Sequence, residues 1–223
     1  SDAKTRSILL YIESIEASQK FMSAARAAAR NKPVIVVKAG RSAQGQKAAA
    51  SHTGALAGSD MVFDAAIRRA GMLRVDTLED LFMAAETLAR FRDNRGEQLA
   101  ILTNGGGAGV MAADAAAQAD IDLCELGAPT LKRLDELLPA NWSHGNPIDI
   151  IGDAPVERYV QALQTLNDDP AVGAVLFIHA PTAIVPSADI ARALVPLVQT
   201  PPRMMGCWLG DAAVAQARKI FRE

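Results

Sequence analysis

Short runs of β-branched and aliphatic residues alternate with longer alanine-rich segments along the chain. The short runs predict buried strands. They are Ile8 to Ile12, Val34 to Lys38, Met72 to Val75, Leu99 to Thr103, Asp122 to Leu126, Gly173 to His179 and Met204 to Leu209, with a shorter one from Ile148 to Ile150. The longer segments, such as Ala17 to Arg30, place small and apolar side chains along one helical face. Because parallel strands are joined by crossovers that usually contain a helix, this alternation predicts an α/β fold with parallel sheets.

A polar, turn-rich stretch from Asp93 to Glu97 interrupts the alternation, which restarts at Leu99. We therefore predict two units, residues 1–95 and residues 96–223, each an open sheet of the flavodoxin-like or Rossmann-like type. The first half offers fewer strands than the usual sheet of about five or six. We expect the chain to be an internal piece of a longer protein, with its first unit truncated at the N-terminus.

Composition excludes several other classes of protein. The 223 residues carry 23 basic and 25 acidic side chains, and 50% are hydrophobic, a balance typical of a folded globular chain. Without a basic block we expect no nucleic-acid partner. No apolar run approaches the roughly 20 residues that span a bilayer, so we expect no membrane partner. Cys124 and Cys207 lie in apolar runs, which favours reduced thiols in a cytoplasmic protein.

A loop is predicted from Ala39 to about Gly58, and it carries the motif Ser51-His52-Thr53-Gly54-Ala55. Loops of that length are usually functional or disordered. A neutral imidazole can act as a nucleophile that takes up a phosphoryl group, and the nearby cations Arg41 and Lys47 would stabilise the transferred charge. His52 is therefore a catalytic candidate, although its spacing alone favours an ordinary surface histidine.

Glu13 follows directly after the first predicted strand and is the second catalytic candidate. Open α/β sheets place catalytic groups beyond the carboxyl ends of their strands, and the loop with His52 leaves the next strand at that end. A carboxylate that accepts a hydrogen bond from one ring nitrogen would make the other nitrogen more nucleophilic. A solvated or helix-capping glutamate is an alternative with equal support.

The segment Thr103-Asn104-Gly105-Gly106-Gly107 connects a predicted strand to a predicted helix. Glycines let the backbone approach an anion closely, and a helix N-terminus offers free N–H groups. We therefore predict a phosphate site at Asn104, Gly105, Gly106 and Gly107, with polar residues of Asn146-Pro147-Ile148-Asp149 lining the same cleft. A tight packing turn and, with Glu125, a weak dinucleotide fingerprint are the alternatives. No motif predicts a metal site.

Several motifs stand in order along the chain, and together they carry a resemblance to a known family. They are Lys32-Pro33-Val34-Ile35-Val36-Val37-Lys38-Ala39-Gly40-Arg41, Ser51-His52-Thr53-Gly54-Ala55-Leu56-Ala57-Gly58, Ala70-Gly71-Met72, Thr77-Leu78-Glu79-Asp80, Thr103-Asn104-Gly105-Gly106-Gly107 and Asn146-Pro147-Ile148-Asp149. Through them the chain resembles the NDP-forming acyl-CoA synthetases, the ADP-forming acetyl-CoA synthetase type related to succinyl-CoA synthetase. The resemblance covers essentially the whole chain.

The resemblance implies a reaction and a site. The histidine matching His52 would be phosphorylated during turnover, and the glutamate matching Glu13 would support it. Acyl-CoA and phosphate would give an acyl phosphate, which phosphorylates the histidine, which in turn phosphorylates ADP. The full-length protein would use CoA or acyl-CoA, and ADP or ATP with Mg.

The resemblance also implies an architecture. Two flavodoxin-like ligase domains would be completed by a CoA-binding domain and an ATP-grasp domain, in the same chain or in a partner subunit. The segment with His52 would move between the acyl-CoA site and the nucleotide site. We expect an oligomer in the cytoplasm, and we expect the fragment alone to be inactive.

Two other functions remain open. Pat-type protein lysine acetyltransferases carry a similar region fused to a GNAT domain, where it serves as an acyl-CoA sensor. Some of these proteins lack the histidine, so the presence of His52 favours the ligase. A non-catalytic, Rossmann-like binding module is the third interpretation, and binding of neither phosphate nor CoA would favour it.

Overall fold

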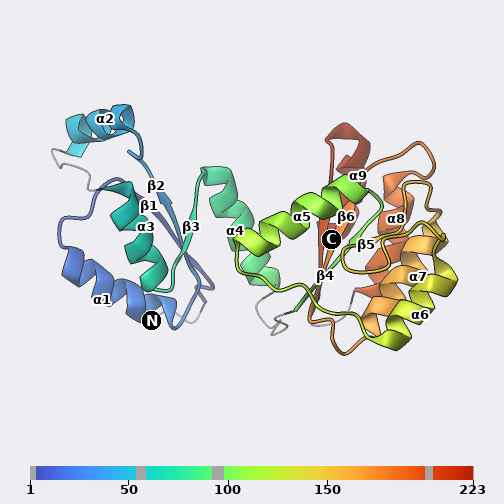
Figure 1. Cartoon of the computed structure of the whole chain (residues 1–223). Helices are drawn as coiled ribbons and strands as arrows, with labels where there is room; N and C mark the ends of the chain where they lie inside the picture. Colours follow the sequence, from blue (N-terminus) through green and yellow to red (C-terminus); the bar gives the residue numbers. More distant parts are fainter. Residues whose placement is uncertain (1–3, 54–58, 92–97, 199–202, 223) are drawn as a thin grey trace. The chain divides into compact units, whose positions relative to one another are not determined.

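A computed structural model of the chain describes residues 4–53, 59–91, 98–198 and 203–222, with the backbone alone for residues 49–53. The chain divides into two compact units, Ser1–Arg92 and Asp93–Glu223 (Figure 1). Each unit is a sheet of parallel strands with helices packed against it, so the predicted α/β class with two parallel-sheet units is confirmed. The predicted boundary between residues 95 and 96 lies outside the described residues.

The first unit is a three-stranded sheet in the order β1-β2-β3. Its elements are β1 (Ile8–Ile12), α1 (Ser18–Ala29), β2 (Val34–Lys38), α2 (Ala43–Thr53), α3 (Asp60–Arg69), β3 (Leu73–Val75) and α4 (Leu78–Arg90). The central strand β2 is buried along its length and faces two layers. Val34 and Val36 pack with residues of α1 and α3, whereas Ile35 and Val37 pack with residues of α4.

Helix α2 occupies most of the segment predicted as a loop, so that prediction is wrong for residues 43–53. The segment contains four alanines, two glutamines and one lysine, residue types with high helix propensity. Ser42 supplies the N-cap, because its Oγ accepts a hydrogen bond from the Gly45 N–H at 3.1 Å. His52 therefore lies in the last turn of a helix.

The second unit is a four-stranded sheet in the order β5-β4-β6-β7. Its strands are β4 (Leu99–Thr103), β5 (Ile148–Asp149), β6 (Ala174–His179) and β7 (Met204–Trp208). Its α-helices are α5 (Gly106–Gln118), α6 (Ala128–Leu137), α7 (Val156–Asn167), α8 (Ser187–Leu194) and α9 (Ala215–Arg222). One face of the sheet packs with α5, and the larger core lies on the other face with residues of α6 to α9.

The strand predicted from Asp122 to Leu126 is reduced to one bridge between Leu99 and Leu123. The side chain of Asn146 interrupts the ladder beyond that bridge. Its Oδ1 accepts from the Ile101 N–H at 2.9 Å, and its Nδ2 donates to the Leu99 carbonyl at 2.8 Å and the Cys124 carbonyl at 3.1 Å. The amide of Asn146 thus replaces strand pairing, and this residue has a structural role rather than the predicted cleft-lining one.

The topology places a switch point at the carboxyl end of β4. The chain runs from β4 to β5, which pairs on one side of β4, and then from β5 to β6, which pairs on the other side. Ligands of open α/β sheets bind beyond the strand ends at such a point. In the part of the chain that the structure describes, no helix has both the length and the apolar character to cross a membrane.

Candidate active site

The predicted catalytic residues follow neighbouring strands of the first sheet. β1 and β2 pair directly, with Ile12 opposite Lys38, so Glu13 and the connection to α2 leave the same edge. Glu13 is half-buried and lines a surface hollow of ≈ 460 Å³ with Ser14 and Phe21. The side chain of His52 lies outside the description, so a contact between Glu13 and His52 stays a prediction.

The turn between β2 and α2 is compact. Gly40 has a φ of 70°, in the left-handed region that favours glycine. A Cβ on Gly45 would lie 3.2 Å from the Cα of Gly40, so the first turn of α2 packs closely on the preceding backbone. Two glycines and the Ser42 cap therefore define where α2 begins and in which direction it starts.

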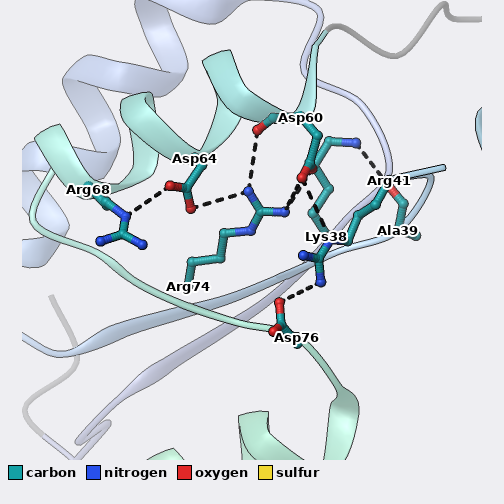
Figure 2. A network of polar contacts seen from close by, with 8 residues as sticks. All are labelled: Lys38, Ala39, Arg41, Asp60, Asp64, Arg68, Arg74 and Asp76. Atoms are coloured by element: carbon teal, nitrogen blue, oxygen red, sulfur yellow. Dashed lines mark hydrogen bonds and ion pairs between the residues drawn. The ribbon is translucent and has the colours of Figure 1, made fainter. Parts of the chain in front are cut away.

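A network of charged side chains surrounds this turn (Figure 2). Arg74 of β3 donates from Nη2 to both carboxylate oxygens of Asp60, at 2.7 and 2.8 Å, and from Nη1 to Asp64 at 3.3 Å. Arg41, just before α2, forms ion pairs with Asp60 at 3.6 Å and with Asp76. Arg41 is therefore engaged by two carboxylates, and its predicted effect on charge at His52 stays a prediction.

Lys38, the last residue of β2, is a buried cation of this network and is only 5% exposed. Its Nζ donates to the Ala39 carbonyl at 2.9 Å and lies 5.4 Å from the centre of the Phe63 ring. Burial lowers the pKa of Lys38, against the opposing effect of Asp60. Burial also acts against the charge of Arg74, but hydrogen bonds and ion pairs with Asp60 and Asp64 outweigh it and raise the Arg74 pKa.

The glycine loop after β4 is held by its own side chains. Thr103 Oγ1 accepts from the Gly105 N–H at 3.0 Å. Asn104 is 3% exposed, and its amide exchanges two hydrogen bonds with the backbone of Ala180, at 2.8 and 2.9 Å. Because both ends of this amide are used, Asn104 joins the ends of β4 and β6, and an anion here would meet backbone groups instead.

Those backbone groups are the N–H donors of Gly106 and Gly107 at the start of α5, for which no acceptor is present among the described residues. Asp149, at the end of β5, lies beside them: a Cβ on Gly106 would be 2.7 Å from its Oδ2. Its Oδ1 accepts from the Ile151 N–H at 2.9 Å, and Ile151 has a φ of 68°. A β-branched residue in the left-handed region is strained, as is common near functional sites.

The other two histidines have structural contacts. His144 contacts the Asp135 carboxylate through Nδ1 at 2.9 Å and the Ala140 carbonyl through Nε2 at 3.1 Å, and these hydrogen bonds raise its pKa, that of Ala140 most. His179 is buried between β6, α7 and α8, next to Tyr159 and Ser187. Among the described residues, no cluster of three histidine, cysteine or acidic side chains is arranged to hold a metal ion.

One site residue, Lys38, was missed by reasoning from the sequence, whereas Asp149 was predicted to line the phosphate cleft. Lys38 ends an otherwise apolar strand, and a charged residue in a buried strand is a signal that a partner must lie nearby. Asp149 stands in a motif that the sequence did single out, but its approach to Gly106 depends on the pairing of β4 with β5.

Two family models match the chain, one over each unit. Residues 1–88 match the succinyl-CoA ligase-like flavodoxin domain, and residues 99–207 match the Ligase-CoA domain.

Curated proteins with similar sequences cover nearly the whole chain. An ADP-forming acetate–CoA ligase I of Archaeoglobus fulgidus is 42% identical over 99% of this chain, which spans 31% of that protein. The alpha subunit of an ADP-forming acetate–CoA ligase I of Pyrococcus furiosus is 38% identical over 87% of this chain, which spans 42% of that subunit. The chain therefore spans less than half the length of these relatives.

A solved structure has the same arrangement of elements. The dinucleotide-forming acetyl-coenzyme A synthetase 1 of Ca. Korarchaeum cryptofilum, in complex with phosphate and ADP, is 32% identical, with a TM-score of 0.88. The match covers 99% of this chain and 49% of the other.

Proposed function

Because the chain belongs to the NDP-forming acyl-CoA synthetase family, we propose that it forms the central part of an ADP-forming acid–CoA ligase. One observation carries the proposal: both units match this family in order, and each has its candidate residues beyond strand carboxyl ends. The relatives described above are acid–CoA ligases or synthetases, which favours the ligase over an acyl-CoA sensor or a binding module.

The proposed reaction passes one phosphoryl group along a chain of carriers. Phosphate attacks the thioester carbonyl of an acyl-CoA, and the C–S bond breaks to release CoA and an acyl phosphate. A ring nitrogen of His52 attacks the phosphorus, the P–O bond to the acyl group breaks, and the free acid leaves. The β-phosphate of ADP then takes the phosphoryl group from the histidine, which gives ATP and restores neutral His52.

Glu13 orients the imidazole of His52 in this proposal. A carboxylate that accepts from one ring N–H leaves the other nitrogen as the nucleophile, and it stabilises the positive charge that develops on the ring. The direct pairing of β1 with β2 supports this role, because it starts both connections from one edge.

The glycine loop would bind the phosphate that enters the reaction. The N–H groups of Gly106 and Gly107 and the start of the thirteen-residue helix α5 favour an anion there. Gly105 makes the turn, and Asn104 holds the loop against Ala180. The carboxylate of Asp149 has the same sign of charge as phosphate, so a bound phosphate would have to tolerate this carboxylate or displace it.

The remaining groups come from outside this chain. CoA, acyl-CoA and the nucleotide would be held largely by CoA-binding and ATP-grasp domains, in the same chain or in a partner subunit of a cytoplasmic oligomer. Among the described residues no cluster of three histidine, cysteine or acidic side chains is arranged to hold a metal ion, and no step above depends on magnesium.

Radiolabelled phosphate tests the proposal in the full-length parent enzyme. Acyl-CoA with labelled phosphate, or labelled ATP alone, should give an acid-labile, alkali-stable phosphoramidate on His52. His52→Ala should abolish both the label and the ligase turnover, while the control Lys20→Ala, at an exposed lysine of α1, keeps both. Persistent labelling in His52→Ala would assign the carrier to another residue.

A further inference from the structure

The first half of helix α2, whose side chains the structure describes, carries little buried apolar surface. Of its residues with described side chains, 43–48, only Gly45 and Gln46 are half-buried and the others are exposed. In proteins most helical stability comes from the packing of an apolar face. Because residues 43–48 offer no such face, the first turn of α2 depends on what fixes its start, which adjoins Arg41.

Arg41 joins the start of α2 to two other connections of the first unit. Its Nε lies 3.6 Å from Asp60, the first residue of α3, and its Nη1 donates to Asp76, which follows β3. Its side chain is 43% exposed, and that of Asp76 is 69% exposed. Isolated ion pairs that are this exposed stabilise proteins little. Arg41 can fix the start of α2 only if its partner Asp60 is itself held in place.

Asp60 is held by a buried partner. The side chain of Arg74 is 8% exposed, and it grips Asp60 with two hydrogen bonds of 2.7 and 2.8 Å to the carboxylate and a third of 3.3 Å to the carbonyl. Nη2 holds the carboxylate and Nη1 the backbone carbonyl, so the guanidinium fixes both the side chain and the backbone of Asp60. The guanidinium also lies 5.6 Å from the Phe63 ring, which Lys38 approaches from β2.

The carboxylates of this network are shared among its cations. Four cations, Lys38, Arg41, Arg68 and Arg74, lie in one network with Asp60, Asp64 and Asp76 (Figure 2). The three arginines are therefore committed to carboxylates, and Lys38 donates to the Ala39 carbonyl, which argues against a phosphate site here and in favour of a fixed support.

We propose that Asp60 and Arg74 are positioning residues for His52, acting through Arg41 on the first turn of α2. The inference rests on the proposed function of His52. At 1.5 Å per residue, His52 lies roughly 14 Å along the helix from Ala43, so a tilt of about 10° at the first turn moves it by roughly 2 Å. A misplacement of about 1 Å can cost about a hundredfold in rate.

Hydrogen exchange of this chain tests the support directly. In Arg41→Gln, the amides of Gln46, Lys47 and Ala48 should exchange at least tenfold faster than in the wild type, while those of β2 keep their rates. Arg68→Gln is the matched control, because Arg68 pairs with Asp64 inside α3 and is 78% exposed. Unchanged exchange in Arg41→Gln, or unprotected α2 amides in the wild type, would overturn the inference.

Labelling of the full-length parent tests the consequence for the reaction. Arg41→Gln and Asp60→Asn should slow the labelling of His52 at least tenfold at saturating phosphate, with Arg68→Gln at the wild-type rate. Arg41→Lys, which keeps the charge without the planar fork, should label at an intermediate rate. Wild-type labelling in Arg41→Gln despite faster exchange of α2 would reduce the network to a structural role.

The two experiments separate this inference from the function on which it rests. A wild-type parent without label on His52 refutes the phosphohistidine, and the exchange rates still decide whether the network supports α2. If Asp60→Asn does not fold, Arg41→Gln decides alone, because it leaves the pair of Asp60 and Arg74 intact.

Discussion

Gly106 shows at the scale of one residue how closely the glycine loop is packed. A Cβ added there would lie 2.7 Å from Asp149 Oδ2, whereas a Cβ on Gly107 has nothing within 4 Å. The two neighbours therefore form a matched pair of positions. Gly106→Val should weaken phosphate binding by about tenfold, the loss of one hydrogen bond to a charged group at about 1.5 kcal/mol.

Calorimetry with inorganic phosphate, using the full-length parent, measures both variants. Gly107→Ala should keep the wild-type affinity as the control. Equal affinities for wild type and Gly106→Val would leave the loop with a packing role alone.

Glu13 belongs to the same scale, because its predicted effect is on the ring of one histidine. Glu13→Gln keeps the size of the side chain but removes its charge, so phosphorylation of His52 should slow by roughly 10- to 100-fold, as for other groups that orient histidines. The fold should be unaffected because Glu13 follows the end of β1, outside the buried core, and glutamine has nearly the same size. Rapid-quench labelling of the parent gives the rate.

Two comparisons test whether Glu13 and His52 act as a unit. Adding Glu13→Gln to His52→Ala should cost no further activity. Glu16→Gln, a nearby exposed glutamate, should label at the wild-type rate. If Glu13→Gln also labels at that rate, the carboxylate is a bystander.

At the scale of elements, His179 joins a strand to two helices of the second unit. It ends β6, its Nε2 is 3.0 Å from Ser187 Oγ of α8, and its Nδ1 is 3.5 Å from the Tyr159 hydroxyl of α7. The ring is fully buried, and burial lowers its pKa from 6.5 to about 4. Protonation therefore favours the unfolded chain, in which the histidine titrates near its ordinary value.

The expected pH dependence follows from that sign. Stability from neutral His179 is complete above about pH 6.5 and falls toward pH 4, by about 1.4 kcal/mol per pH unit and about 3 kcal/mol in all. Urea unfolding followed by tryptophan fluorescence reports on this unit, since Trp142 and Trp208, the 2 tryptophans of the chain, both lie in it.

A glutamine variant isolates the contribution of His179. His179→Gln keeps polar atoms for Ser187 and Tyr159 but cannot titrate, so its unfolding free energy should fall less between pH 6.5 and 4. The raised pKa of His144 gives the opposite trend, a loss as the pH rises above about 6.5, in both proteins. Parallel curves below pH 6.5 would show that His179 does not titrate as its burial predicts.

The elements also show which features the sequence could predict. Apolar runs with β-branched residues predicted six of the seven strands well and β5 as a short strand, because burial on both faces leaves a strong pattern. Helix α2 was missed because its sequence has no one-sided apolar pattern. The strand pairing at Leu123 stops after one bridge because of the side chain of Asn146, more than twenty residues away in the sequence. Contacts such as those of Arg74 with Asp60 depend on packing between elements, which no local pattern encodes.

At the scale of the whole molecule, the two units carry different parts of one proposed reaction. The first has the histidine helix and its charged support, and the second has the glycine loop at a switch point. Resemblance to a family predicted this division from motifs spread over the chain. What it did not predict is that Asn104 and Arg41, both polar and both beside candidate sites, are used up by internal contacts.

The last prediction concerns the chain as a single piece. Formation of ATP from acyl-CoA, phosphate and ADP needs sites for CoA and for the nucleotide, and we have proposed that separate domains supply most of both. The relatives are more than twice as long as the part that this chain matches. The 223 residues should therefore fold and give no ATP with acetyl-CoA, phosphate and ADP, whereas the full-length parent at equal concentration gives ATP that luciferase detects. Binding of phosphate by the piece is compatible with this outcome, because binding needs the loop alone. Sustained ATP formation by the 223 residues would show that they contain both substrate sites, and the division of labour between domains would then have to be drawn again.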